Sequence, residues 1–351
     1  MTVANNDKGR PSIFGTGLIA LDLVISSNPA TPVQSWVGGT CGNVLSILAY
    51  LGWDAFPIAR MNSDPASQRA KADMKRWGVR LDFATCTPAT HTPIIIQEIR
   101  RGRDGLPIHK FSWSCGRSGH WLPGFKPVVA KSVEWILPKV DGVSVFFMDR
   151  LSRAALNMSA AAADGGALVV FEPSGRSDGP LLTEALRIAH IVKYAEQRLP
   201  ELAGVMGKGA ATLLEIQTLG AMGLRFRHKL GVRLSPWRHL PAIAVPALAD
   251  TCGAGDWCTA GFLAMAAKHG VEGFRVAGVE ALGVALQYGQ TLASWSCGFE
   301  GARGGMYAVE RAVFNAQIKA LWSGRPRAQS FEHRMRPRIH TAAVPCPACP
   351  L

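Results

Sequence analysis

Residues 250–256 have the side chains and the spacing needed to transfer a phosphoryl group to a hydroxyl. The segment reads Asp-Thr-Cys-Gly-Ala-Gly-Asp, and it lies between an apolar run at 243–248, which we expect to be extended, and a run at 257–268 with helical spacing. A carboxylate beside an anion site repels the ligand, so Asp256 suggests a base that takes the proton of an attacking hydroxyl. The small residues that leave backbone N–H groups open to an anion are Gly253, Ala254 and Gly255. Taken alone, the segment fits an ordinary acid in the first turn of a helix equally well.

Asp22 and the turn that follows it are candidates for holding a substrate. Asp22 interrupts an apolar run, residues 13–24, that we predict to be the first strand. A buried carboxylate costs free energy unless it is paired or faces a cleft, so we expect a binding role, with a structural hydrogen bond as the alternative. Gly38, Gly39 and Asn43 offer backbone donors and an amide, which suits a polyhydroxylated ligand. On its own this turn is better explained as a capped glycine turn.

Two other glycine-containing segments are similar to nucleotide-binding loops. Residues 218–223 follow a predicted strand, and taken alone they are more typical of a tight hairpin. Residues 15–20 fit the dinucleotide fingerprint as a string. That fingerprint must open a helix after a complete strand, whereas here the apolar run continues as strand to Val24. We therefore interpret residues 15–20 as a chance match.

The elements that must position these groups alternate between extended and helical segments. This alternation predicts an α/β fold with a mostly parallel sheet covered on both faces. Residues 90–119 contain β-type residues and turns without a helix, which predicts an antiparallel insertion. We predict strands at 13–24, 55–59, 79–83, 143–148, 167–171, 188–194 and 211–218, an antiparallel strand at 223–228, and helices at 42–51, 65–77, 256–269, 272–296 and 307–322.

Composition excludes several classes of protein. No apolar run is long enough to span a bilayer, and the first twelve residues lack a signal-peptide pattern, so we expect no membrane association. The eight scattered cysteines are typical of reduced thiols, which indicates a cytoplasmic protein. Part of the net charge of +13 comes from a basic, proline-rich segment at 323–351, which we expect to be a mobile tail. No nucleic-acid-binding motif accompanies the charge, so no nucleic-acid partner is expected.

Jointly, these motifs resemble those of the ribokinase family, the PfkB carbohydrate kinases, over residues 12–322. One signature comprises Gly38-Gly39, Asn43, Leu51-Gly52 and residues 59–64; the other is residues 250–256 followed by Ala260-Gly261. The resemblance implies a three-layer α/β sandwich with a mostly parallel central sheet and a small β-sheet lid, inserted at about 26–36 and 90–119. It also implies ATP and Mg²⁺ as cofactors, with K⁺ in some members.

Residue roles follow from this resemblance by position. Asp256 resembles the catalytic base, and Gly253, Ala254 and Gly255 resemble an anion hole. The groups that resemble a substrate site are Asp22, Gly38, Gly39 and Asn43; those on the nucleotide side are Lys193, Thr218, Gly220, Gly223, Gly301 and Ala302; and Asp250 with the carbonyl of Cys252 resembles a monovalent-cation site. One departure concerns the family's Asn-x-x-Glu, where this chain has Ala195 and Arg198. Glu196 or Glu201 is then the candidate for organising Mg²⁺ through water.

Three functions remain open from the sequence. The favoured one is a kinase that phosphorylates a sugar or sugar-like molecule. A nucleoside kinase is the second, because Trp36, Phe111 and Trp113 could stack on a base or simply form the core of the lid. The third is a ligand-binding regulator with weak catalysis, which the missing Asn-x-x-Glu permits. A homodimer through the lid is also expected, since flap strands have open edges.

Overall fold

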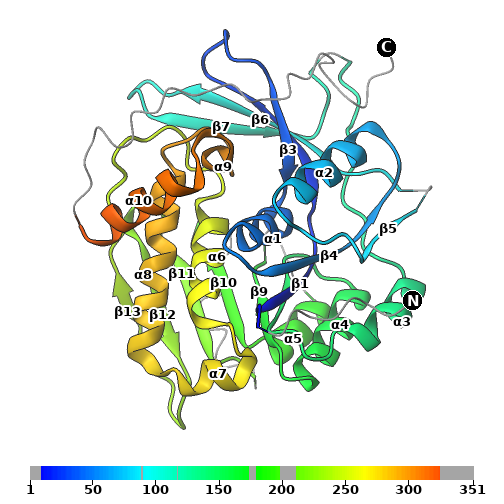
Figure 1. Cartoon of the computed structure of the whole chain (residues 1–351), viewed down its shortest axis with the longest axis vertical. Helices are drawn as coiled ribbons and strands as arrows, with labels where there is room; N and C mark the ends of the chain where they lie inside the picture. Colours follow the sequence, from blue (N-terminus) through cyan, green and yellow to red (C-terminus); the bar gives the residue numbers. More distant parts are fainter. Residues whose placement is uncertain (1–8, 88–89, 117, 174–178, 198–210, 325–351) are drawn as a thin grey trace.

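The computed structural model describes residues 9–87, 90–116, 118–173, 179–197 and 211–324, and its largest element is a nine-stranded sheet (Figure 1). The strand order is β13-β12-β11-β10-β9-β8-β1-β4-β5, in which the pairs β11–β12 and β12–β13 are antiparallel and the remaining pairs are parallel. The strands are β1 (Ser12–Thr16), β4 (Asp54–Met61), β5 (Ala84–Cys86), β8 (Val145–Met148), β9 (Leu168–Phe171), β10 (Ile191–Ala195), β11 (Leu214–Thr218), β12 (Leu224–His228) and β13 (Arg238–Leu240). Strand order reverses between β1 and β8, and open α/β sheets bind ligands at such a point.

Helices cover both faces of this sheet, because its strands are apolar on both sides. In β8, Val145 and Phe147 join one core cluster while Phe146 and Met148 join the other. The first cluster packs under α1, α6, α8 and α10, and the second under α3, α4 and α5. The helices are α1 (Thr40–Tyr50), α2 (Pro65–Arg76), α3 (Ala130–Ile136), α4 (Arg153–Asp164), α5 (Pro180–Ile188), α6 (Ala254–Ala266), α7 (Gly270–Val276), α8 (Gly278–Ser296), α9 (Gly304–Ala308) and α10 (Arg311–Trp322). The predicted three-layer architecture is confirmed.

A separate four-stranded sheet, which we call the lid, lies over α9 and across the top of Figure 1. Its order is β3-β2-β6-β7, formed by β2 (Ala20–Ile25), β3 (Gln34–Gly38), β6 (Ile94–Arg101) and β7 (Pro107–Ser112). Successive side chains of a strand point to opposite faces. Leu21 and Leu23 therefore lie in a cluster on one face, whereas Val24 and Trp36 pack with Tyr307 of α9 on the other. We call this second face the inner face.

The predicted strand at 13–24 is wrong, because these residues form two strands in two different sheets. Strand β1 ends at Thr16 in the central sheet, and β2 begins at Ala20 in the lid. The break occurs at Gly17, whose φ of 146° is rarely adopted by other residues. Both strands are buried and apolar, so composition alone could not separate them. Residues 15–20 lead into a strand, which agrees with our rejection of the dinucleotide fingerprint.

Several element boundaries also differ from the predictions. Residues 79–83 and 243–248 form no strand, and the predicted helix at 272–296 is divided by Gly278, which has a φ of 77°. The helix predicted at 307–322 is divided by extended residues Val309 and Glu310. The lid includes all of β2, which we had assigned to the central sheet. Residues 325–351, most of the predicted tail, lie outside the described residues. No helix within the described ranges is long and apolar enough to cross a membrane.

Candidate functional site

The segment Asp250–Gly255, which we call the anion loop, leads directly into α6. Gly253 caps this helix in a left-handed conformation, with a φ of 75°. A Cβ atom there would lie 2.6 Å from Ala302, so only glycine fits the position. The indole of Trp257 donates a hydrogen bond to the Ala302 carbonyl at 2.9 Å. The loop is therefore packed tightly against residues 301–302, with the first N–H groups of a helix at its end.

Asp256 lies in the first turn of α6 and is partly accessible to solvent. Its Oδ2 accepts a hydrogen bond of 2.7 Å from Nδ2 of Asn43. Burial raises the pKa of Asp256 to about 7, with Glu172 adding to the rise, while Asn43 and Lys193 oppose it. A carboxyl group that titrates near neutral pH is suited to general base catalysis.

A buried ion pair supports the anion loop from behind. Nζ of Lys193 lies 2.5 Å from Oε1 of Glu172 and donates to the Gly255 carbonyl at 3.2 Å. The other oxygen of Glu172 accepts a hydrogen bond of 2.6 Å from Thr259. Burial alone would lower the pKa of Lys193, but Glu172 and neighbouring groups raise it, which favours the ammonium form. In this structure Lys193 holds the loop backbone, and its expected role beside ATP stays a prediction.

The residues expected to bind substrate lie close together opposite the anion loop. Gly39 caps α1 with a φ of 76°, and a Cβ atom there would lie 2.4 Å from the Leu18 carbonyl. A Cβ atom on Gly38 would lie 1.8 Å from the carboxylate of Asp22. Burial raises the pKa of Asp22 to about 7, although Arg303 and the Gly39 backbone lower it. Asn43, the fourth member, reaches across to Asp256.

Two charged residues at the site were missed by the sequence analysis. Arg303 is completely buried, and its Nε donates to Oδ1 of Asn43 at 3.1 Å. Asp149 follows β8 and accepts hydrogen bonds from the Leu18 N–H at 2.8 Å and from Arg150 at 3.0 Å. An arginine among glycines and an acid at the carboxyl end of a parallel strand were signals that could have identified them.

Four buried polar atoms, three of the lid and one of Arg303, have no hydrogen-bond partner among the described residues. They are Oδ1 of Asp22, Nε1 of Trp36, Oε1 of Gln97 and Nη1 of Arg303. Trp36 lies opposite Asp22 in the β2–β3 ladder, and Gln97 belongs to neighbouring β6. Buried polar groups are normally satisfied, so unpartnered donors and acceptors together indicate a place for a polar ligand. A hydroxyl group both donates and accepts, and it suits such a mixture.

The expected nucleotide-side residues lie at the β11–β12 connection and near the lid. Residues 218–223 form a hairpin turn, which confirms the hairpin interpretation. Packing alone explains a glycine at position 223, since a Cβ atom there would lie 2.2 Å from the Leu240 carbonyl. Gly220 has open space around it apart from the end of Gln197, and Thr218 ends β11. A Cβ atom on Gly301 would lie 2.5 Å from Trp36. The nucleotide role of these residues stays a prediction.

The candidate monovalent-cation ligand, Asp250, is already surrounded by N–H donors. Oδ2 accepts from Nε2 of Gln97 at 2.7 Å and from the Gly301 N–H at 2.9 Å. Oδ1 accepts from the Cys252 N–H at 3.0 Å and lies 3.4 Å from Nδ1 of His109. Donors on both oxygens of a carboxylate do not suit a cation site. The residues present therefore do not fit K⁺ at this position.

The described residues contain no cluster of three acidic, histidine or cysteine side chains that could hold a metal. Of the two candidates for contacting magnesium through water, Glu196 is exposed after β10, whereas Glu201 lies outside the described residues. Mg²⁺ usually binds through one or two carboxylates, waters and the phosphates of its nucleotide. An exposed carboxylate at the end of a central strand fits such a partial role, in which most ligands come with ATP.

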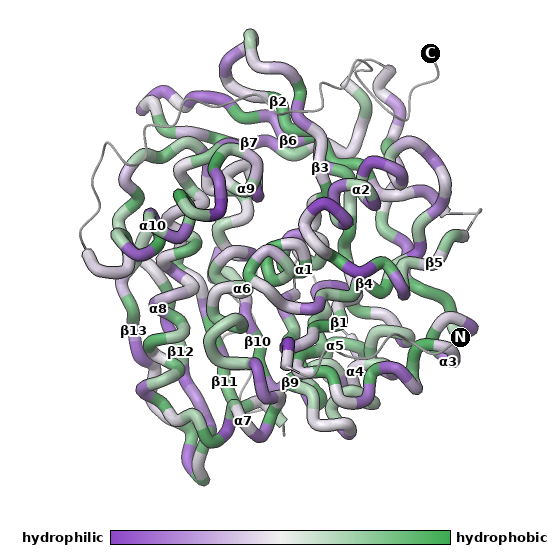
Figure 2. Tube along the Cα trace, viewed as in Figure 1, coloured by the Kyte–Doolittle hydropathy of each residue, from purple (hydrophilic) through white to green (hydrophobic). Residues whose placement is uncertain are grey.

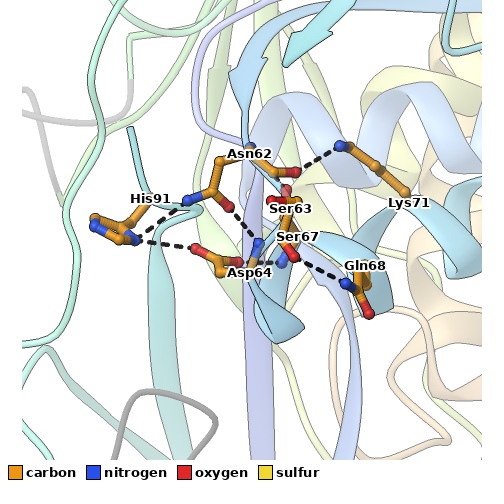
Figure 3. A network of polar contacts seen from close by, with 7 residues as sticks. All are labelled: Asn62, Ser63, Asp64, Ser67, Gln68, Lys71 and His91. Atoms are coloured by element: carbon orange, nitrogen blue, oxygen red, sulfur yellow. Dashed lines mark hydrogen bonds and ion pairs between the residues drawn. The ribbon is translucent and has the colours of Figure 1, made fainter. Parts of the chain in front are cut away.

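A second polar network, shown in Figure 3, fixes the start of α2. Oδ1 of Asp64 accepts from the Ser67 N–H at 2.7 Å, which caps the helix. Its other oxygen lies 3.2 Å from His91, and Nδ2 of Asn62 lies 3.3 Å from the same imidazole nitrogen. Helix α2 is largely hydrophilic in Figure 2, so this capping and the contact of its residue Asp73 with Arg303 help to hold it in place. Residues 59–64, part of the first signature, therefore have a structural role here.

No protein-family model and no curated protein matches the chain. Solved structures do match. A ribokinase from Giardia lamblia has a TM-score of 0.66 and 14% identity over 92% of this chain and 98% of that chain. An aminoimidazole riboside kinase from Salmonella enterica, complexed with aminoimidazole riboside and an ATP analogue, has a TM-score of 0.64 and 20% identity, covering 89% and 99% of the two chains. A nucleoside kinase from Burkholderia thailandensis in complex with inosine has a TM-score of 0.63 and 18% identity, covering 90% and 98%. The ribokinase-like fold is therefore confirmed.

Proposed function

We propose that this protein is an ATP-dependent kinase that phosphorylates a hydroxyl group of a small sugar or sugar-like molecule. The observation that carries the proposal is the position of Asp256, which follows the left-handed cap Gly253 in the first turn of α6 and contacts Asn43. This arrangement places an acid that titrates near neutral pH beside the N–H groups of a helix N-terminus. The complex of the aminoimidazole riboside kinase with an ATP analogue supports ATP as the phosphate donor.

The reaction follows from this geometry. The N–H groups of Gly253, Ala254 and Gly255 would hold the γ-phosphate, and the ion pair of Lys193 with Glu172 keeps that loop in shape. Asp256 would accept the proton of the acceptor hydroxyl as its oxygen attacks the phosphorus. Mg²⁺ bound with ATP would supply positive charge against the phosphates. Asp22 and Asn43 would orient the acceptor, so that the attacking oxygen and the leaving oxygen lie in line.

The unpartnered polar atoms favour a hydroxyl-rich acceptor over a nucleoside. Trp36 is 3% exposed and stacks on Tyr307 with ring centroids 4.5 Å apart, so it is not free to stack on a base. The other two aromatic candidates lie in the lid region, where Trp113 is half exposed and Phe111 is partly buried. By contrast, Asp22 and Gln97 present unpartnered oxygens that can accept from hydroxyl groups.

The proposal extends to organisation and location. Residues 12–322 would act as one kinase unit in the cytoplasm, where reduced thiols such as those of Cys41, Cys258 and Cys297 are usual. A homodimer would form along the lid edges β3 and β7.

A coupled screen for ADP production across sugars, sugar acids and nucleosides tests the proposed function. We expect turnover with at least one sugar or sugar acid, and its loss in Asp256→Asn. Turnover of nucleosides alone would favour the nucleoside kinase. Tight binding of a sugar without turnover by the unmodified protein would favour the ligand-binding regulator.

A further inference from the structure

Arg303 is a buried charge that the proposed chemistry does not itself require. It precedes α9 and has no exposed surface. Its Nη2 donates to Oδ2 of Asp73 at 2.7 Å and to the Val37 carbonyl. Asp73 is held in turn by the Val37 N–H at 2.9 Å and by the hydroxyl of Tyr307 at 2.8 Å. The guanidinium is therefore fixed by α2, β3 and α9 before it contacts the site.

The hydrogen bond from Nε of this guanidinium decides which way the amide of Asn43 points. The amide of asparagine has a donating end and an accepting end, whereas a guanidinium only donates and a carboxylate only accepts. Nε of Arg303 donates to Oδ1 of Asn43 at 3.1 Å, and Nδ2 of Asn43 donates to Oδ2 of Asp256 at 2.7 Å. A flipped amide would place two donors together at Arg303 and two acceptors together at Asp256. Arg303 thus selects one of the two orientations.

We propose that Arg303 is a positioning residue for Asp256, acting through Asn43 to keep the carboxylate hydrogen-bonded and ready to accept a proton. The proposal rests on the proposed function in one respect, namely that Asp256 is the base. A chain of buried contacts, Asp73–Arg303–Asn43–Asp256, then connects α2 to the reacting end of α6.

The other groups around Asp256 make its ionisation sensitive to this contact. Asp149 after β8 and Glu172 after β9 raise the pKa of Asp256, in addition to burial, while Asn43 and Lys193 of β10 lower it. Cys41 of α1 also faces the carboxylate, and burial keeps the pKa of this thiol well above its ordinary value. Asp149 carries its own partner, Arg150. Among these groups Asn43 is the one whose orientation depends on Arg303.

Two variants of nearly equal shape separate positioning from charge. In Arg303→Gln the amide nitrogen occupies the place of Nε and can still donate to Asn43, although the charge is lost. In Arg303→Met a methyl group takes the same place, and both the donor and the charge are lost. Arg311→Met is the matched control, because Arg311 packs on Tyr50 and is exposed.

The pKa of Asp256 is measured in the ligand-free protein by ¹³C NMR titration of aspartate carboxyls, with the resonance assigned by its loss in Asp256→Asn. We expect Arg303→Met to raise this pKa by about one unit, the usual size of an effect from a charge-stabilising hydrogen bond. Arg303→Gln should raise it by clearly less, and Arg311→Met should leave it unchanged. Equal shifts in the methionine and glutamine variants, or no shift in either, would overturn the proposal.

Arg303→Met leaves Asp73 buried without its cation, which can cost enough to unfold the protein. Each variant is therefore also made together with Asp73→Asn, and compared with Asp73→Asn alone. The same order of pKa values is expected in this background, and the absence of that order contradicts the proposal.

Activity gives a second measurement that separates this inference from the proposed function. With an acceptor that the unmodified protein phosphorylates, the acid limb of the kcat–pH profile should move upward in Arg303→Met and less in Arg303→Gln. Failure to find any acceptor contradicts the kinase assignment, while the NMR result still decides whether Arg303 positions Asn43. A drop in kcat at every pH without a shift of the limb would contradict the positioning role.

Discussion

At the scale of single residues, the site contains two acids, the buried Asp22 and the partly accessible Asp256, with similar pKa values and different surroundings. Burial raises the pKa of both Asp22 and Asp256 to about 7. Asp256 has a donor, Asn43, on one oxygen, whereas Oδ1 of Asp22 has no partner within the described ranges. Two acids of similar acidity can thus have different roles, one reacting with the acceptor and the other binding it.

Asp256→Asn should lower turnover by about 10²–10⁴-fold, the usual contribution of a positioned base. ATP affinity should change little, because the N–H groups of the loop remain. In the unmodified protein kcat should increase as pH rises through about 7, since the base must be ionised and burial raises its pKa to that value. Steady-state kinetics between pH 5.5 and pH 8.5 test both statements. Near-normal turnover in the variant would contradict the assignment.

Asp22→Asn should stabilise the protein at pH 8 and have little effect near pH 4. The pKa of Asp22 is about 7 in the folded protein against 3.8 for the ordinary group, so the folded state binds more protons between these values. Stability associated with this group is therefore present below about pH 4 and lost as pH rises towards 7. Thermal unfolding at both pH values measures the difference. Asp82→Asn, at an exposed position, is the control.

At the scale of elements, the anion loop and the lid are joined by one carboxylate. Asp250 accepts from Gln97 of the lid and from backbone N–H groups of the anion loop and of Gly301. Gly301 packs in turn against Trp36 on the inner face of the lid. The position of the lid and the shape of the anion loop are consequently linked through Asp250.

Gly253→Ala should disturb the anion loop without unfolding the sheet. A residue other than glycine is strained at a φ of 75°, by roughly 1–2 kcal/mol, and its Cβ would also contact Ala302 at 2.6 Å. We expect kcat to fall by more than tenfold with a modest decrease in the melting temperature. Gly231→Ala, where a Cβ atom meets nothing within 4 Å, should behave as the unmodified protein does.

Gln97→Leu should weaken the contact between the lid and the anion loop. Loss of the 2.7 Å bond leaves one donor fewer at Asp250, which is 1% exposed. We expect a higher KM for the acceptor and more ATP hydrolysis per acceptor phosphorylated, because a loose lid admits water. Gln68→Leu removes an exposed hydrogen bond to Ser63 and should change neither quantity.

Potassium should not activate the enzyme through Asp250, because N–H donors face both of its carboxylate oxygens. Turnover measured in potassium, sodium and tetramethylammonium salts at equal ionic strength should agree within about twofold. A bound K⁺ that lowered the activation free energy by about 1.4 kcal/mol would instead raise turnover about tenfold. A strong and selective stimulation by K⁺ would contradict this interpretation of the site.

At the scale of the whole molecule, the fold brings together residues that are far apart in sequence. Asp149 receives the N–H of Leu18 because β1 and β8 are neighbours at the point where strand order reverses. Asn43 contacts Asp256 because α1 packs against α6. The outer face of the lid is covered by the chain itself, including Leu122.

The sequence predicted the parts of the molecule that have strong local signals. Gly253, Gly38 and Gly39 have positive φ or close contacts that leave no room for a Cβ atom, so only glycine fits these positions. The division between β1 and β2 could not be predicted, since Gly17 interrupts an apolar run that is buried in both sheets. The role of Arg303 depends on contacts with residues more than 200 positions away, which no local pattern encodes.

The passage of residues 12–25 through two sheets has a consequence for synthesis on the ribosome. Strand β1 pairs with β4 and with β8, and β8 begins 133 residues after β1 does. Strand β1 therefore keeps an unpaired edge while more than one hundred further residues are translated. Strand β2 pairs with β3 and with β6, so one of its edges stays unpaired until β6 has been translated. Unpaired strand edges on a partly folded chain promote aggregation. We therefore expect the nascent chain to depend on chaperones until β8 has been made.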